Sequence, residues 1–235
     1  VNNNPSNPII NLRAYSDVPN IVSEYGNSFI DGIQDNGIFA CAKHFPGHGN
    51  TDIDSHSSLP IINVDKNTIY NNELYPFKSA IENSVEMIMI GHLVVPSLDP
   101  SQKPSTHSKR IITNILKKDL SFNGLVITDA MEMGALSSNI SNDESVIRAV
   151  EAGSDILLLP IDAISSIDAI KNAVLNGRID ENRINQSVSK ILKLKENAGL
   201  FNNEGFPNWT NIEQFVGSSK HKNIAKKIKA ESTTL

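Results

Sequence analysis

The sequence has little cysteine and no long apolar run, and each shortage excludes a class of protein. Its 235 residues include a single cysteine, Cys41, which excludes an internal disulfide and any zinc or iron–sulfur site built on several cysteines. No apolar run approaches the roughly 20 residues of a membrane-spanning helix, and the longest covers 156–159. Residues 1–5 lack the charged start and apolar stretch of a signal peptide. Because the chain begins with Val1 instead of Met, we expect its true start to lie upstream.

The charge balance is mildly acidic, with 21 basic and 26 acidic residues and a net charge of −5. This balance argues against nucleic acid as the main partner. Basic residues gather once, near the C-terminal end, at Lys220, Lys222, Lys226, Lys227 and Lys229. We interpret that cluster as the solvated face of a helix. The hydrophobic share of 39% is sufficient for a sizeable core.

Four short apolar runs predict buried β-strands, at 38–42, 86–90, 125–127 and 155–159. Their nearly continuous hydrophobicity is typical of parallel strands that are covered on both faces. Before, between and after these runs, apolar residues at helical spacing predict helices at 21–33, 111–116, 146–150 and 184–195. A last helix is expected at 218–231. Ser108 is expected to cap the second of these helices. Strands and helices alternate, so the fold class is α/β with parallel strands.

Length and strand count leave two architectures open. A barrel of eight strand–helix units usually needs about 250 residues or more, whereas this chain shows four such units. The chain is therefore either a small open doubly wound sheet or part of a larger barrel. Half a barrel would leave two strand edges unpaired and apolar helix faces exposed, which favours homo-association through these edges.

Reactive side chains follow the predicted strands, where parallel α/β folds bind their ligands. Lys43 and His44 come after the first run. Either they bind ligand oxygens, or the lysine pairs with a neighbouring carboxylate and the histidine is held by hydrogen bonds. His92 follows the second run. Asp129 follows the third, as a nucleophile, a general base, a metal ligand or the N-cap of a helix. Arg13 lies in an irregular segment and has the features of a surface arginine.

The loop after the first run carries the densest polar cluster. Asp54 and His56 are two residues apart, so in a turn the carboxylate can orient the imidazole as a general acid or base. The alternative is a turn started by Asp54 with a surface histidine. His44 and His48 join these two residues as a candidate metal cluster, although a loop supplies no regular spacing that aims the four at one point.

Several long motifs occur along the chain in one order. They are 43–51 with its continuation at 54–56 and 59–60, then 73–77, 88–92, 124–133, 152–155 and 183–192. These motifs resemble glycoside hydrolase family 3, and more narrowly its bacterial β-N-acetylhexosaminidase branch. The resemblance implies the C-terminal half, about four βα units, of a (β/α)8 TIM-type barrel over 1–200. Residues 201–235 are then expected to be a linker and a helix that lead toward a C-terminal domain.

The resemblance also implies the chemistry of a retaining glycoside hydrolase. Retention takes two steps, in which a carboxylate attacks the anomeric carbon and water then releases the sugar. Asp129 matches the family's nucleophile, and Asp54 with His56 matches the acid/base pair of this branch. A histidine with an ordinary pKa of about 6.5 can donate a proton to the leaving oxygen near neutral pH and later accept one from water.

Arg13, Lys43 and His44 match the branch's sugar-binding positions, and His92 is a further candidate. No metal and no organic cofactor is implied. The expected activity is the release of terminal β-N-acetylglucosamine from peptidoglycan- or chitin-type fragments. The alternatives are a catalytically incomplete fragment that binds at most a sugar or a partner, a β-glucosidase-type exo-hydrolase, and a metal-dependent hydrolase.

Overall fold

A computed structural model describes residues 1–10, 13–51, 59–137, 140–202 and 212–232. The chain divides into two compact units, Val1–Leu192 and Lys193–Leu235. The expected boundary at 200 and the role of 201–235 as a linker stay predictions. Among the described residues, no helix has both the length and the apolar character that crossing a membrane requires.

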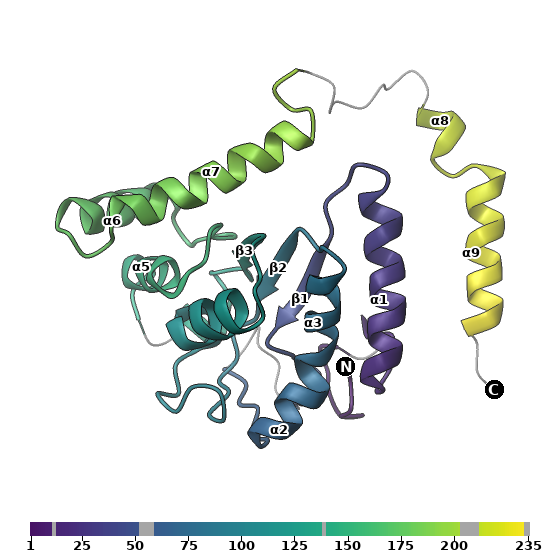
Figure 1. Cartoon of the computed structure of the whole chain (residues 1–235), viewed down its shortest axis with the longest axis horizontal. Coiled ribbons are helices and arrows are strands. Elements are labelled where there is room, and N and C mark those ends of the chain that lie inside the picture. Colours follow the sequence, from purple (N-terminus) through teal and green to yellow (C-terminus); the bar gives the residue numbers. More distant parts are fainter. Residues whose placement is uncertain (11–12, 52–58, 138–139, 203–211, 233–235) are drawn as a thin grey trace. The chain divides into compact units, whose positions relative to one another are not determined.

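Three parallel strands form the sheet of the first unit, in the order β1, β2, β3 (Figure 1). They are β1 (Cys41–Phe45), β2 (Met87–Ile90) and β3 (Leu125–Thr128). The fourth predicted run adds a single parallel bridge, between Ile127 and Ile156. Leu159 at its end is 55% exposed, so the expectation that all of 156–159 is a buried strand is wrong. The parallel α/β class is confirmed.

Strand β1 lies further along the chain than the predicted range 38–42. Ile38, which supplied part of the apolar signal, is 64% exposed and follows Gly37, whose φ of 77° belongs to the left-handed region. Phe45 is completely buried, and the strand extends to include it. Lys43 and His44 therefore lie within β1, and the prediction that they follow the strand is corrected.

Helices flank the sheet and form the second unit (Figure 1). They are α1 (Pro19–Gln34), α2 (Lys66–Thr68), the π-helix η2 (Ile69–Glu73), α3 (Tyr75–Glu82), the 3-10 turn η3 (Ser105–His107), the π-helix η4 (Arg110–Asp119), α4 (Gly134–Ser137), α5 (Asn142–Ala152), α6 (Ala163–Leu175), α7 (Glu181–Asn197), α8 (Ile212–Phe215) and α9 (Ser219–Ser232). The Ser108 hydroxyl accepts from the N–H of Ile111 at 3.1 Å, which is the capping contact that the sequence predicts.

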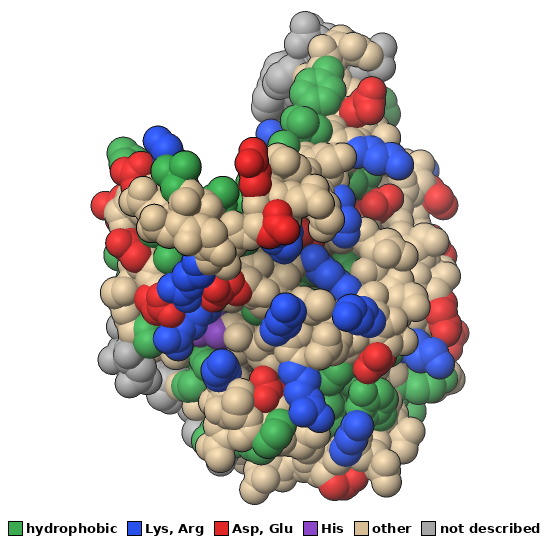
Figure 2. All heavy atoms as spheres, turned by 60° about the vertical axis from the view of Figure 1, so that its left-hand side comes forward, with side chains coloured by type: hydrophobic (Ala, Val, Ile, Leu, Met, Phe, Trp, Pro, Cys, Tyr) green, Lys and Arg blue, Asp and Glu red, His purple; other side chains and the backbone are tan. Residues whose placement is uncertain are grey.

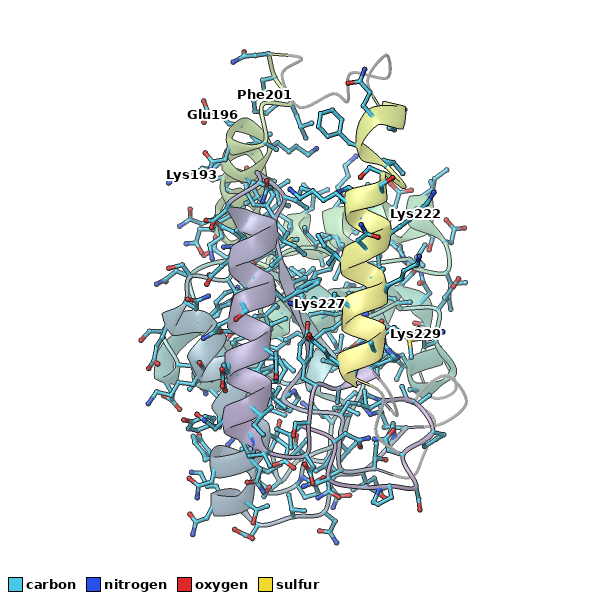
Figure 3. The ribbon with its side chains drawn as sticks, turned by 90° about the vertical axis from the view of Figure 1, so that its right-hand side faces the viewer. Lys193, Glu196, Phe201, Lys222, Lys227 and Lys229 are labelled. Atoms are coloured by element: carbon cyan, nitrogen blue, oxygen red, sulfur yellow. The ribbon has the colours of Figure 1, made fainter. Side chains whose placement is uncertain are left out.

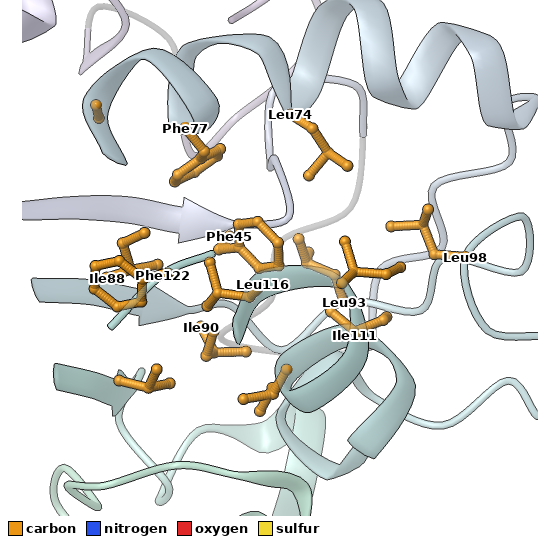
Figure 4. Packing of buried hydrophobic residues seen from close by; sticks show 14 of the residues in the cluster. Phe45, Leu74, Phe77, Ile88, Ile90, Leu93, Leu98, Ile111, Leu116 and Phe122 are labelled. Carbon is orange, nitrogen blue, oxygen red and sulfur yellow. The ribbon is translucent and has the colours of Figure 1, made fainter. Parts of the chain in front are cut away.

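The main core lies between the strands and helices α3 and η4 (Figure 4). Phe45 from β1 meets Phe77 from α3 edge-to-face, with ring centroids 5.2 Å apart. Ile88 from β2 and Leu116 from η4 are completely buried beside them. Each such side chain contributes about 1.5–3 kcal/mol when it leaves water. This core packs against β1, β2 and β3, at whose ends the candidate site is built.

Charged side chains cover two outer helix surfaces. Arg178 pairs with Glu144 and Glu151 of α5. Acidic and basic side chains are interspersed on the face that Figure 2 shows. In the second unit, every residue of α9 is exposed, and lysines such as Lys222 and Lys227 project outward from it (Figure 3). The basic cluster therefore lies on an exposed helix, and its interpretation as a solvated face stays a prediction.

Some large apolar side chains stay exposed on the first unit. Tyr25 and Phe29 of α1 are 56% and 57% exposed, and Ile164 of α6 is 75% exposed. These side chains lie on helices α1 and α6, as expected for the exposed apolar helix faces of half a barrel. Homo-association through such edges stays a prediction.

Candidate functional site

The ends of β1 and β3 bring His44 and Asp129 together. His44 Nε2 lies 3.5 Å from Asp129 Oδ2. Asp129 follows β3 directly, and its backbone N–H donates to the carbonyl of Ile90 at 2.9 Å, so sheet bonding reaches the residue itself. Its Oδ1 accepts from the N–H of Ala130 at 2.9 Å. The carboxylate, 19% exposed, thus has one oxygen tied to the backbone and the other beside an imidazole.

His44 is a neutral imidazole in this arrangement. Burial lowers its pKa to about 3, although the negative charge of Asp129 opposes that shift. The 3.5 Å approach to Asp129 is therefore a contact with a neutral ring instead of an ion pair. The ring of His48 stands edge-on to it, with centroids 5.8 Å apart. Nδ1 of His44 is buried and has no hydrogen-bond partner among the described residues.

A cleft of about 270 Å³ opens beside β1 and α1. Within the described residues, its polar lining includes Arg13, Lys43 and His44, and its apolar lining includes Tyr15 and Phe29. Three of the four predicted sugar-binding residues therefore share one cavity. The guanidinium of Arg13 donates to the carbonyl of Ile9 at 3.3 Å, which ties it to its own segment while it remains exposed. Polar groups at the edge of an apolar cleft are typical of small-molecule sites.

His92, the fourth predicted sugar-binding residue, lies behind Asp129 and is 0% exposed. Its Nε2 is 2.9 Å from the carbonyl of Ala130, and its Nδ1 is 2.7 Å from Oγ1 of Thr106. It does not line the cleft that the described residues form. Thr106 was not singled out from the sequence, because nothing in a polar Ser-Thr-His-Ser run indicates which hydroxyl meets a histidine.

Glu73 is a second residue that sequence reasoning did not place at the site. It is 2% exposed, and burial raises the pKa of its carboxyl. It packs under the turn after β1, because a Cβ built on Gly47 would lie 2.5 Å from Cβ of Glu73. Gly47 also has a φ of 127°, so both space and backbone conformation require glycine there. Glu73 therefore supports the turn that carries His48.

The predicted acid/base pair, Asp54 and His56, lies outside the described residues. The rival metal cluster depends on the same two residues, together with His44 and His48. Over the described parts of the chain, no group of three or more His, Cys, Asp or Glu side chains converges in a way that would hold a metal ion.

Residues 1–194 match the family described as "Glycosyl hydrolase family 3 N terminal domain". The chain belongs to glycoside hydrolase family 3. The TIM-barrel-type α/β class expected from the motifs of this family is confirmed. A β-N-acetylglucosaminidase structure of the family, from Paenibacillus sp. str. FPU-7, is 38% identical with a TM-score of 0.83, over 85% of this chain and 39% of that one.

Other family 3 relatives have different activities in their names. "Beta-hexosaminidase A" of Pseudoalteromonas piscicida is 36% identical over 216 residues, which are 83% of this chain and 36% of that protein. "Beta-glucoside phosphorylase BglX" has a TM-score of 0.92 at 25% identity, over 97% of this chain and 43% of that one. The chain thus spans less than half the length of each relative named here.

Proposed function

We propose that this family 3 chain supplies the nucleophile and sugar-binding residues of a retaining β-N-acetylhexosaminidase. The observation that carries the proposal is the approach of His44 Nε2 to Asp129 Oδ2 at 3.5 Å. His44 also lines the cleft with Arg13 and Lys43, whereas Asp129 is not among the described residues that line it. The names of the hexosaminidase and N-acetylglucosaminidase relatives support the sugar class.

In the proposed first step, Oδ2 of Asp129 attacks the anomeric carbon and the glycosidic C–O bond breaks. The leaving oxygen takes a proton from His56, which Asp54 orients. In the second step, His56 accepts a proton from water, the water oxygen bonds to the anomeric carbon, and the ester to Asp129 breaks. Because Oδ1 is held by the N–H of Ala130, attack falls to Oδ2.

Sugar binding is assigned to Arg13, Lys43 and His44. Arginine and lysine are donors only, and charge-assisted hydrogen bonds to sugar oxygens are stronger than neutral ones. The neutral imidazole of His44 can donate or accept. The proposed substrate is a terminal β-linked N-acetylglucosamine of a peptidoglycan- or chitin-type fragment.

A second candidate is transfer of the sugar from a β-glucoside to phosphate. The observation in its favour is the likeness to the β-glucoside phosphorylase over 97% of this chain. In that reaction a phosphate oxygen replaces water in the second step, and the cations of Arg13 and Lys43 suit an anionic acceptor. Formation of a glycosyl phosphate when phosphate is added, at the expense of free sugar, would favour this candidate.

The test uses the full native polypeptide and an aryl N-acetyl-β-glucosaminide. Asp129→Asn should abolish turnover, whereas Asp119→Asn, an exposed aspartate at the end of η4, should leave it unchanged. A fluorinated sugar that slows the second step should label Asp129, as mass spectrometry of peptides would detect. Labelling of another residue would overturn the assignment. His56→Ala should slow substrates with poor leaving groups most, since these need the proton.

A further inference from the structure

His92 and Thr106 form a buried pair directly behind Asp129. Both side chains are 0% exposed. His92 follows β2, Thr106 belongs to η3, and the carbonyl that His92 contacts belongs to Ala130, just after Asp129. The pair therefore connects three segments at the strand ends on which the proposed site is built.

The two contacts fix one tautomer of His92. A carbonyl oxygen only accepts, so Nε2 must carry the hydrogen that reaches Ala130 at 2.9 Å. Nδ1 then accepts from the hydroxyl of Thr106 at 2.7 Å. Both ring nitrogens are thus satisfied in the neutral form, and burial lowers the pKa of His92. A ring that uses both nitrogens inside the protein has none left for a sugar.

The backbone of Ala130 links His92 to the carboxylate of Asp129. The carbonyl of Ala130 is held by His92, while its N–H donates to Oδ1 of Asp129 at 2.9 Å. Next in the chain, the N–H of Met131 donates to the carbonyl of Leu158 at 2.8 Å. These two bonds fix the peptide unit between Ala130 and Met131, and with it the Cα of Ala130, which also carries the N–H that Oδ1 of Asp129 accepts from.

We infer that His92, supported by Thr106, is a positioning residue that acts through Ala130 to hold Oδ1 of Asp129 and leave Oδ2 facing His44. This inference rests on the proposed function, in which Asp129 is the nucleophile. It gives His92 a different part from the sugar contact that the family resemblance implies. A nucleophile displaced by about 1 Å can lose about a hundredfold in rate, so such support matters to the chemistry.

Variants of both residues separate the two hydrogen bonds. His92→Phe removes both at similar volume, whereas His92→Gln keeps a donor at the distal position. Thr106→Val removes only the hydroxyl, and Thr106→Ser retains it. The matched control is His107→Phe, because His107 is also a buried histidine but pairs with Ser145.

The kinetic readout is kcat, KM and the rate at which the fluorinated sugar labels Asp129 in the full native polypeptide. His92→Phe should lower kcat and the labelling rate about 10- to 100-fold with little change in KM. Thr106→Val should cost about fivefold, as expected for one neutral hydrogen bond. His92→Gln and Thr106→Ser should restore most of the rate, and His107→Phe should have little effect.

A spectroscopic readout needs no activity. Nitrogen-15 NMR of the histidine rings should show His92 as the Nε2–H tautomer, with a pKa below the ordinary value of about 6.5. Thr106→Val should shift the Nδ1 resonance. A His92 ring with a pKa at or above that ordinary value, or the opposite tautomer, would overturn the pairing even if the proposed function is right.

The outcomes keep the two proposals apart. If the sugar labels no residue or labels one other than Asp129, the proposed function fails, while NMR still decides the pairing. If Asp129 is labelled in folded His92→Phe at the native rate, the positioning role is refuted. A raised KM with unchanged kcat would instead make His92 a sugar contact. If His92→Phe does not fold, His92→Asn, which is too short to reach Ala130, must be at least about tenfold slower than His92→Gln.

Discussion

Asp155→Asn tests the buried carboxylate that joins helix α7 to strand β3 and helix η4. The Asp155 side chain is 2% exposed, and its carboxylate lies 3.2 Å from Lys117 Nζ and 3.2 Å from Arg183 Nη1. It also accepts from the hydroxyl of Ser187 at 2.6 Å and from the N–H of Val126 at 3.1 Å. One carboxylate thus joins η4, β3 and α7 at the base of the fold. The variant keeps the shape and removes the charge.

The expected loss is about 3 kcal/mol of unfolding free energy. Removing one partner of a buried ion pair costs about 3–5 kcal/mol, because the other charge stays buried without compensation. Lys117 and Arg183 are 21% and 22% exposed, and their partial hydration moves the cost to the lower end of that range. Burial lowers the pKa of Lys117 to about 8 while Asp155 opposes the shift, so the variant also weakens the charged state of the lysine.

Urea unfolding followed by circular dichroism measures this loss. Asp168→Asn, an exposed aspartate of α6, is the control and should stay within about 0.5 kcal/mol. Burial alone would raise the pKa of Asp155, but Lys117 and the hydrogen bonds outweigh it and the pKa is lowered. The contribution of Asp155 is therefore complete above the unfolded pKa of about 3.9. This contribution is lost as the pH falls toward the pKa of Asp155 in the folded protein. The unfolding free energies of the native protein and Asp155→Asn should therefore converge in acid.

A loss of less than about 1 kcal/mol for Asp155→Asn at pH 7, which is the value of an exposed ion pair, would refute the buried role of Asp155. A double variant with Lys117→Met adds an independent check. If the two residues interact as described, the double variant should lose at least about 1 kcal/mol less than the sum of the single losses. Additive losses would mean that Asp155 acts mainly through Arg183 and the neutral hydrogen bonds.

Two further predictions concern stability. Burial lowers the pKa of His107 to about 4. Between pH 6.5 and 4 the unfolded chain therefore binds a proton that the folded chain does not, and the free energy of unfolding falls with falling pH by up to about 3 kcal/mol. His107→Phe should flatten this pH dependence in urea titrations, and an unchanged slope would contradict the prediction. A Cβ on Gly124 would lie 2.3 Å from the carbonyl oxygen of Glu86, so Gly124→Ala should cost about 1–3 kcal/mol. Gly26→Ala, with nothing within 4 Å, should gain stability in the same assay.

The strands show how far apolar patterns determine the fold. Runs 86–90 and 125–127 nearly coincide with β2 and β3, because residues covered on both faces leave a continuous apolar signal. The first run is misplaced because Ile38 is apolar but exposed, and composition does not report what covers a side chain. Helix α6 was not predicted from periodicity, and its exposed Ile164 and Ile167 do not mark a buried face.

The sequence also indicates some residues of the candidate site and not others. Asp129 and His44 could be selected from the sequence because each lies at or near the end of a strand that alternation of strands and helices makes parallel. The partners of His92 could not be selected from the sequence, because Thr106 is 14 residues away and lies on a different element. Strand position indicates which residues approach the ligand, whereas the contacts behind them depend on how the connecting turns fold.

The neutral state of His44 bears on how the proposed nucleophile would work. A protonated His44 would form an ion pair with Asp129 and draw electron density from the attacking oxygen. Burial prevents this by lowering the pKa of His44 to about 3, so the carboxylate is held by a backbone N–H and a neutral ring, neither of which cancels its charge. The cations of Lys43 and Arg13 line the cleft instead, where they can bind sugar oxygens. Lysine keeps its charge to a much higher pH than histidine, so His44→Lys should lose kcat more than KM rises, because it places a positive charge beside the nucleophile.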